Sequence, residues 1–303
     1  MITADSRTDI RRPVSWFVGT CGISNPQWVG NFYPRGLRSI ERLAYYAGHF
    51  NSIELNTTFH AIPERWKVQR WKDATPCNFR FCVKFPREVT HGRPESLLKT
   101  DTLRKASRFF DVVQELGEKL ALVLLQFPPW FSSSHRSALL RFVDLVRGST
   151  PLVLEFRNTN WWTPATEAAL RERNIGWATA DLTSHPEVAP RCDNGQVQSS
   201  GLRQLICTTD FVYVRMIGKH HQFRFHVEEY FDSTHRLTCW LDELTRILKG
   251  RTDVRRVYTF FDDDFSGHAP TSARRLANMV KLPRTFEAVS VQSNQLVLPF
   301  SLI

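Results

Sequence analysis

The side chains best placed to do chemistry follow an apolar run that begins at Leu152. Glu155, Arg157 and Trp161 bring a carboxylate, a guanidinium and an indole within seven residues of one another. Alternation along a strand puts Glu155 and Arg157 on one face and the apolar residues between them on the other. Charged groups at the end of a buried strand cost folding free energy. The stretch therefore indicates a polar functional site.

Other apolar runs also end in polar or ionic side chains. These are Glu54 with Asn56, Lys84, Gln126, Asp181, Arg215 and the pair Asp262–Asp263. In several runs the polar residues lie two apart, as Glu54 with Asn56 and Thr179 with Asp181, which would aim both at the interior or the mouth of a barrel. Ion pairs that simply close the barrel are the alternative. Because a ring of desolvated charges is costly, a polar pocket is favoured.

A small anion is the substrate that these side chains predict. Arg157 and Arg215 can each hold a carboxylate or a phosphate through two parallel N–H groups. The other residues predicted to bind substrate are His91, Asn56, Gln126, Asp181 and Trp161, the last at a pocket wall.

Three residues are the candidate catalytic groups, namely Glu155, Lys84 and Glu54. Glu155 or Glu54 can serve as a general base. Lys84 or His91 can donate a proton or neutralise an enolate-like charge. A lysine on a barrel strand can also form a Schiff base, although neighbouring arginines lower the pKa of a lysine without any such chemistry.

The same strand ends contain potential metal ligands. They are Glu54, Glu155, Asp181, Asp262 and His91. No HxH or HExxH spacing accompanies them, and three cationic side chains compete for the same volume. We therefore assign no metal-binding residues, and the sequence identifies no cofactor.

The elements that must position these residues alternate between strands and helices. The predicted strands are Trp16–Thr20, Ser52–Asn56, Phe79–Lys84, Leu120–Gln126, Leu152–Arg157, Ile175–Ala180, Phe211–Met216 and Arg256–Phe261. Helical apolar spacing follows them, as in Leu237, Leu241, Leu244 and Leu248. Eight such units predict an α/β fold, a single (β/α)8 TIM-like barrel, whose site lies at the carboxyl ends of the strands. A doubly wound sheet is the competing fold, but no GxGxxG follows the first strand.

One domain accounts for the 303 residues. We expect a flexible tail over residues 1–14, the barrel over residues 15–283 and a C-terminal tail over residues 284–303. Residues 182–208 lack periodicity and predict a long loop with short irregular structure.

Composition predicts a cytoplasmic protein. The longest unbroken apolar run, Leu120–Leu125, is far shorter than a membrane span, and the first residues contain no apolar signal segment. The six cysteines form no CxxC pair, which favours reduced thiols.

A formal net charge of +10 favours anionic partners without choosing among them. The alternative to a small-molecule enzyme is therefore a nucleic-acid-binding or repair protein that uses a basic barrel face. The segment from Lys219 to His226 is basic and aromatic and could contact phosphates, although a solvated loop is favoured because no nucleic-acid-binding signature accompanies it. A scaffold with a vestigial pocket is a third hypothesis, and the oligomeric state stays open.

Several motifs in this order resemble the YecE-like family, domain of unknown function 72. They are Val18–Gly22, Phe32–Pro34, Glu54–Phe59, Phe81–Lys84, Thr90–His91, Gln126–Pro129, Glu155–Arg157 and Tyr213–Arg215. The resemblance implies a TIM-like barrel and supplies no reaction. This chain differs from the family pattern at His60, where a tyrosine is usual, and at Asp262–Asp263, where two asparagines are usual.

Overall fold

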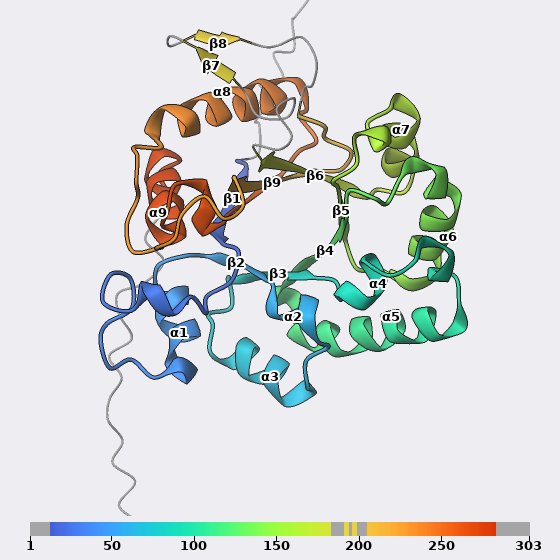
Figure 1. Cartoon of the computed structure of the whole chain (residues 1–303), viewed down its shortest axis with the longest axis horizontal. Helices are drawn as coiled ribbons and strands as arrows, with labels where there is room; N and C mark the ends of the chain where they lie inside the picture. Colours follow the sequence, from blue (N-terminus) through green and yellow to red (C-terminus); the bar gives the residue numbers. More distant parts are fainter. Residues whose placement is uncertain (1–12, 183–190, 194–195, 199–204, 283–303) are drawn as a thin grey trace, which may run out of the picture.

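Eight parallel strands form a nearly closed barrel within the part of the chain that the structure describes (Figure 1). The computed structural model describes residues 13–182, 191–193, 196–198 and 205–282. The barrel strands are β1 (Ser15–Thr20), β2 (Ser52–Leu55), β3 (Arg80–Lys84), β4 (Leu120–Phe127), β5 (Leu152–Phe156), β6 (Gly176–Leu182), β9 (Phe211–Gly218) and β10 (Arg256–Phe261). Their order is β1-β10-β9-β6-β5-β4-β3-β2. A bridge between Cys21 and Glu54 brings the two outermost strands together. The predicted barrel is confirmed.

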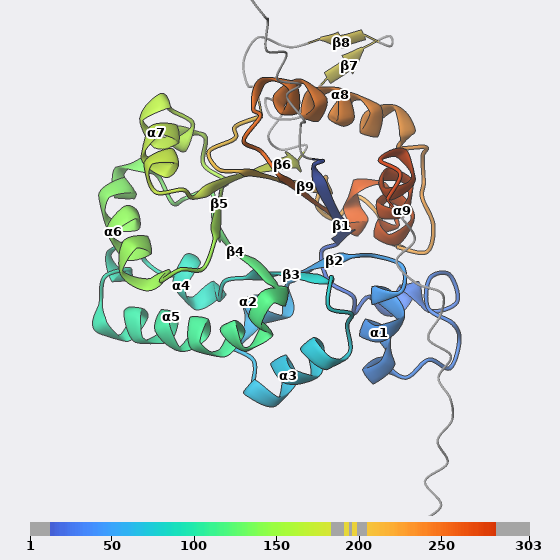
Figure 2. The same ribbon diagram turned by 180° about the vertical axis from the view of Figure 1, so that it is seen from behind.

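Helices surround the barrel, as the view from behind also shows (Figure 2). They are α1 (Arg42–Ala47), α2 (Thr57–His60), α3 (Arg65–Asp73), α4 (Arg87–Thr90), α5 (Thr100–Val113), α6 (Arg136–Val146), α7 (Pro164–Glu172), α8 (Thr234–Gly250) and α9 (Ala269–Met279). Proline in the first turn, as in α7 and α9, suits a helix start because its missing N–H has no intrahelical partner there.

An antiparallel hairpin lies outside the barrel, in the segment predicted to be a loop. It consists of β7 (Arg191–Asp193) and β8 (Gln196–Gln198). The predicted tails fall almost entirely outside the described residues. In the described part of the chain, no helix combines the length and the apolar character needed to cross a membrane. Cys239 on α8 is disulfide-bonded, so the expectation of reduced thiols is wrong at that position.

Two apolar cores follow from strand alternation. A small inner cluster fills the barrel and includes Cys82, Val153 and Tyr213. A larger cluster lies between the strands and the helices and includes the residues next to them in sequence, such as Val83 and Leu154. Lys84, Glu155 and Arg215 lie two residues beyond the three inner residues named. They therefore continue the inner face to the carboxyl end of the barrel.

Candidate functional site

Arg215 on β9 organises the charges at the barrel mouth. Its Nε and Nη2 donate to the two carboxylate oxygens of Glu54, at 2.8 and 2.7 Å. Its Nη1 donates to Glu155 Oε2 at 2.6 Å. Arg215 is only 3% exposed, and both carboxylates are buried. Burial disfavours the charge of Arg215, but the two glutamates outweigh it and raise the pKa of the guanidinium.

Glu155 lies between two guanidinium groups. Arg157 donates to Glu155 Oε1 through its Nε, while Arg215 occupies the other oxygen. Burial raises the pKa of Glu155, but the charges of Arg157 and Arg215 outweigh it and bring the pKa to about 2. Glu155 is therefore ionised at neutral pH and accepts a proton poorly.

Lys84 differs from the two arginines because it forms an ion pair with none of the described carboxylates. In the described part of the chain, its ammonium group makes neither a hydrogen bond nor an ion pair. The side chain is 8% exposed, and Nζ lies 4.2 Å from the centre of the Phe59 ring. Burial lowers the pKa of Lys84 to about 8, and the charge of Arg215 acts in the same direction. Lys84 can therefore both hold and release a proton near neutral pH.

His91 joins this group from the end of α4. Its ring meets the edge of Phe59 at a centroid distance of 5.1 Å, and its Nδ1 lies 3.0 Å from Thr90 Oγ1. Burial lowers the pKa of His91 to about 4, and Lys84 and Arg87 add to the effect. His91 is consequently neutral at pH 7.

Two predicted polar residues complete the neighbouring strand ends. Asn56 directly follows β2, and its buried Oδ1 has no hydrogen-bond partner in the described part of the chain. Gln126 on β4 is paired in register with Glu155, and its amide donates to the carbonyl of Phe127 at 3.1 Å. An unpaired buried oxygen costs free energy, so Asn56 is suited to accept a hydrogen bond from a ligand.

Two predicted site residues lie elsewhere. Asp181 faces the outer helical layer, where Arg236 and the indole N–H of Trp240 on α8 bind its carboxylate. The prediction that it faces the mouth is wrong, because alternation along β6 puts Ala178 on the inner face and Asp181, three residues on, on the outer face, where it pairs in register with Met216. Trp161 is 1% exposed and stacks on Phe156. It fills the outer core and does not form a pocket wall.

The two aspartates after β10 have separate roles. Asp263 accepts hydrogen bonds from Asn25 Nδ2 at 2.6 Å, Trp28 Nε1 at 2.9 Å and the backbone of Ala269 at 2.9 Å. It therefore secures the loop after β1. Burial raises the pKa of Asp262 to about 6, and the charge of Asp263 contributes. The charge of Arg215 opposes this increase, so Asp262 lies close enough to add negative charge near Arg215.

Replacing Asp262 by asparagine should stabilise the protein at neutral pH. The folded-state pKa of Asp262 lies above the ordinary value of 3.8. Ionisation of this carboxyl therefore lowers the free energy of unfolding of the native protein as pH rises from about 4 through about 6. We expect the variant to gain about 1–3 kcal/mol at pH 7 and little at pH 4. Urea unfolding at both pH values measures this. Asp263→Asn is the control and should destabilise, whereas an equal gain from both variants contradicts the assignment.

Four contributors to the site were not predicted as site residues. Tyr213 donates to Glu54 Oε2 at 2.8 Å, and Cys21 Sγ lies 3.9 Å from Arg215 Nη2. Phe59 covers Lys84, and His220 Nε2 lies 3.4 Å from Arg157 Nη1. The position of Tyr213, two residues before Arg215 on the same face, is the sequence signal that could have identified it.

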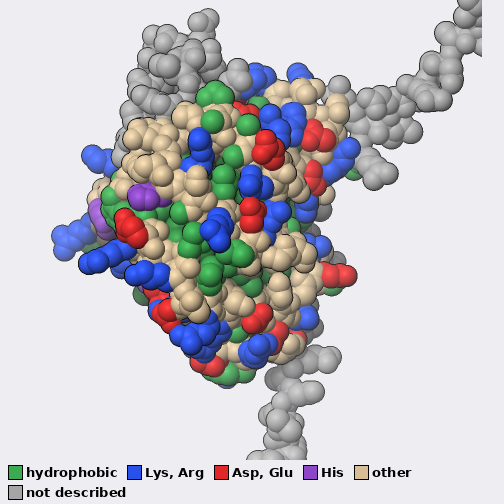
Figure 3. All heavy atoms as spheres, turned by 90° about the vertical axis from the view of Figure 1, so that its right-hand side faces the viewer, with side chains coloured by type: hydrophobic (Ala, Val, Ile, Leu, Met, Phe, Trp, Pro, Cys, Tyr) green, Lys and Arg blue, Asp and Glu red, His purple; other side chains and the backbone are tan. Residues whose placement is uncertain are grey.

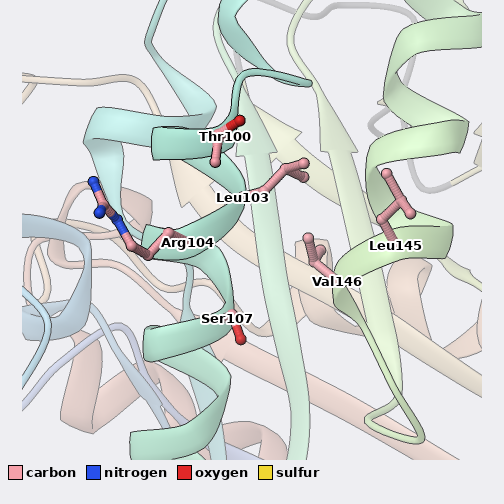
Figure 4. Close-up of a pocket in the computed structure, with 6 residues that line it drawn as sticks. All are labelled: Thr100, Leu103, Arg104, Ser107, Leu145 and Val146. Atoms are coloured by element: carbon pink, nitrogen blue, oxygen red, sulfur yellow. The ribbon is translucent and has the colours of Figure 1, made fainter.

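A cavity of about 400 Å³ lies in the outer layer, between α5 and α6 (Figure 4). Its lining residues are Thr100, Leu103, Arg104, Ser107, Leu145 and Val146. None of them belongs to the charged cluster at the mouth. The face of the molecule seen in Figure 3 mixes apolar, basic and acidic side chains instead of presenting a continuous basic surface.

The described residues contain no group of three or more His, Cys, Asp and Glu side chains placed to share a metal ion. Arg215 engages both oxygens of Glu54 and one oxygen of Glu155. The carboxylates of Glu54 and Glu155 therefore bind guanidinium groups in this arrangement.

A nearly closed parallel barrel with charged groups at the carboxyl ends of its strands defines a TIM-barrel protein. The sequence matches the family described as "Protein of unknown function DUF72" over residues 17–295. The chain therefore belongs to this family, as the motifs indicated.

Curated relatives agree with this family. The chain is 30% identical to UPF0759 protein YunF of Bacillus subtilis over 63% of this chain and 67% of that protein. It is 31% identical to UPF0759 protein YecE of Escherichia coli K12 over 58% of this chain and 61% of that protein. The match thus spans less than two thirds of the E. coli protein.

Solved structures show the same fold. A DUF72 family protein (TM1631) of Thermotoga maritima has a TM-score of 0.66 at 24% identity, covering 88% of this chain and 99% of that one. A DUF72 family protein (EF0366) of Enterococcus faecalis has a TM-score of 0.65 at 17% identity, covering 89% of this chain and 99% of that one.

Proposed function

We propose that this protein is an enzyme that binds a small carboxylate or phosphate at the barrel mouth and moves a proton with Lys84. The observation that carries the proposal is the buried ammonium group of Lys84, which has no ionic partner in the described part of the chain. A buried, unpaired cation is costly, and an anionic substrate would remove that cost.

The distribution of charge in the cluster supports an anion. Arg215 and Arg157 are bound to Glu54 and Glu155, so these four charges cancel. Asp262 adds negative charge near Arg215, whereas Lys84 is a buried positive charge that pairs with none of the described carboxylates. Asn56 follows β2, the strand paired with β3, and offers a buried oxygen that has no partner among the described residues. A ligand that combines an anionic group with a hydroxyl donor would match both groups.

The roles follow from the surroundings of each residue. Arg157 is only partly buried and also approaches His220, so it can orient the anionic group. Lys84 is the proton carrier because its pKa of about 8 lies near neutral pH. Glu155, with a pKa of about 2, holds Arg157 and Arg215 in place and is a weaker candidate for the base than the sequence indicated.

Replacing Lys84 by methionine should weaken phosphate binding at least about 10-fold, or about 1.4 kcal/mol. Calorimetric titration of the intact chain with phosphate, glycerol phosphate and malate at low ionic strength measures this. Wild-type affinity for phosphate should fall between pH 7 and pH 9, because Lys84 loses its proton through about pH 8. The methionine variant should lack that fall.

Lys119→Met is the matched control for this experiment. Lys119 also has a lowered pKa because of burial, but it bonds to the carbonyls of Lys72 and Thr75 near the start of β4, away from the mouth. Its replacement should leave phosphate affinity within about twofold. Absence of binding by any of the three anions would contradict the proposal, and salt-sensitive binding of duplex DNA alone would support the nucleic-acid alternative.

A further inference from the structure

We propose that Lys84 forms a covalent imine with its substrate, which narrows the substrate class to small aldehydes and ketones that carry a carboxylate or a phosphate. The inference rests on the proposed function, because the anionic group is what brings the carbonyl carbon to Lys84. It adds a bond-forming role that anion binding alone does not require.

Hydrogen bonds hold the backbone at Lys84, and this fixes the position from which its side chain extends. The hydroxyl of Thr58 donates to the Lys84 carbonyl at 2.6 Å, and the next amide, that of Phe85, donates to the carbonyl of Leu124 at 2.8 Å. Lys84 is the last residue of β3 and lies on its inner face. Its amine therefore reaches the mouth from a rigid strand, as a positioned nucleophile must.

The surroundings of the amine favour its neutral, nucleophilic form. The Phe59 ring covers it at 4.2 Å, and no carboxylate lies within ion-pair distance among the described residues. Burial and Arg215 lower its pKa to about 8, so a substantial fraction is uncharged just above neutral pH. A desolvated lysine beside another cation is the usual means of activating an amine for imine formation.

Cys21, the other nucleophile near Arg215, is poorly suited to this role. Burial raises the pKa of its thiol well above the ordinary value, and the Glu54 carboxylate adds to the increase. The thiol therefore keeps its proton, and only the thiolate is strongly nucleophilic. Of these two groups, the amine of Lys84 is therefore the better nucleophile.

The reaction balances without an oxidant or a metal. The neutral amine of Lys84 attacks the carbonyl carbon, a C–N bond forms, and the C=O electron pair moves to oxygen, which takes up a proton. Nitrogen loses a proton to give a carbinolamine. A second protonation lets the oxygen leave as water while the nitrogen lone pair forms C=N, giving a protonated imine. The neutral imidazole of His91, which packs edge-on against the same Phe59 ring, can relay these protons.

The test is reductive trapping of the intact chain. Pyruvate, glyoxylate and glycolaldehyde phosphate are each incubated with the protein and reduced with sodium borohydride, and the product is mapped by mass spectrometry. We expect Lys84 to gain the mass of the carbonyl compound less one oxygen atom. Trapping should be at least about 10-fold greater at pH 8 than at pH 6, because the neutral fraction falls about tenfold per pH unit below the pKa.

Matched variants separate this inference from the proposed function. Lys84→Arg keeps the positive charge but cannot form the imine, so it should lose the adduct, while phosphate binding is measured on the native chain. Lys119→Arg should retain the adduct on Lys84. Phosphate binding without an adduct, or equal labelling of Lys84 and Lys119, overturns the inference and leaves the proposed function standing. Absence of both phosphate binding and adduct overturns both.

Discussion

Replacing Arg215 by methionine should lower the free energy of unfolding by about 3–5 kcal/mol, as expected when one partner of a buried ion network is removed. Methionine retains much of the side-chain volume, so the loss reports mainly on charge. The substitution removes three hydrogen bonds from Arg215 to Glu54 and Glu155. Both carboxylates would remain buried, and Glu54 would retain only the bond from Tyr213 among those described. Urea unfolding at pH 7 measures the effect.

The pH dependence distinguishes this mechanism from poor packing. In the native chain, the depressed pKa of Glu155 gives stability that is present above about pH 4.5 and is lost as pH falls toward 2. Without Arg215, a buried carboxylate gains stability by taking up a proton. The two proteins should therefore converge as the pH is lowered from 7 to 4. A difference that does not change with pH would indicate a packing defect instead.

An exposed arginine supplies the control for charge removal. Arg246 pairs with Glu243 on the surface of α8, and its side chain is 48% exposed. Replacing Arg246 by methionine should cost less than about 1 kcal/mol, the usual value for a surface ion pair. If both substitutions cost the same, the buried network does not stabilise the barrel as described.

The barrel could be predicted from the sequence because its signals are local. Apolar runs of strand length are followed by helical spacing, and each predicted strand corresponds to an observed one with ends shifted by a few residues. The hairpin β7–β8 gave no such signal, since each strand has three residues. A pattern that short cannot be separated from a loop by periodicity.

The sequence predicted only some of the residues that form the candidate site. Lys84, Glu155 and Arg215 each lie two residues beyond a member of the inner cluster, so alternation puts all three on the inner face. The same alternation puts Asp181 on the outer face, because Ala178 of β6 belongs to the inner cluster. Both alternating sets of positions in β6 contain apolar residues, so its sequence did not indicate which set faces the inside of the barrel.

The partner of each charge could not be predicted, and the proposed function depends on these partners. The sequence assigns Arg157 and Arg215 to anion binding but does not tell which of Glu155, Lys84 and Glu54 is best suited to proton transfer. The fold gives the carboxylates of Glu54 and Glu155 to the two arginines. Lys84 lies against the Phe59 ring instead, and this is why the proposed function assigns proton transfer to Lys84 on β3 and not to Glu155 on β5.

Replacing Trp161 by alanine should lower the free energy of unfolding by about 3–5 kcal/mol, the usual cost of removing a buried tryptophan. Its ring stacks on Phe156 and Phe131 at centroid distances of 4.3 and 5.5 Å. Its indole N–H donates to the carbonyl of Phe131 at 2.7 Å. The substitution would leave a cavity and an unpaired carbonyl in the outer core. Chemical unfolding measures the loss.

Phosphate affinity is the second measurement on the Trp161 variant, because it separates packing from substrate contact. If Trp161 acts only in the outer core, the folded variant should bind phosphate as the native chain does. Trp130 is the matched control, since it lies in the preceding loop and is 53% exposed. Its replacement by alanine should change stability by no more than about 0.5 kcal/mol. If the Trp161 variant instead lost phosphate binding but kept native stability, the prediction that Trp161 forms a pocket wall would be supported.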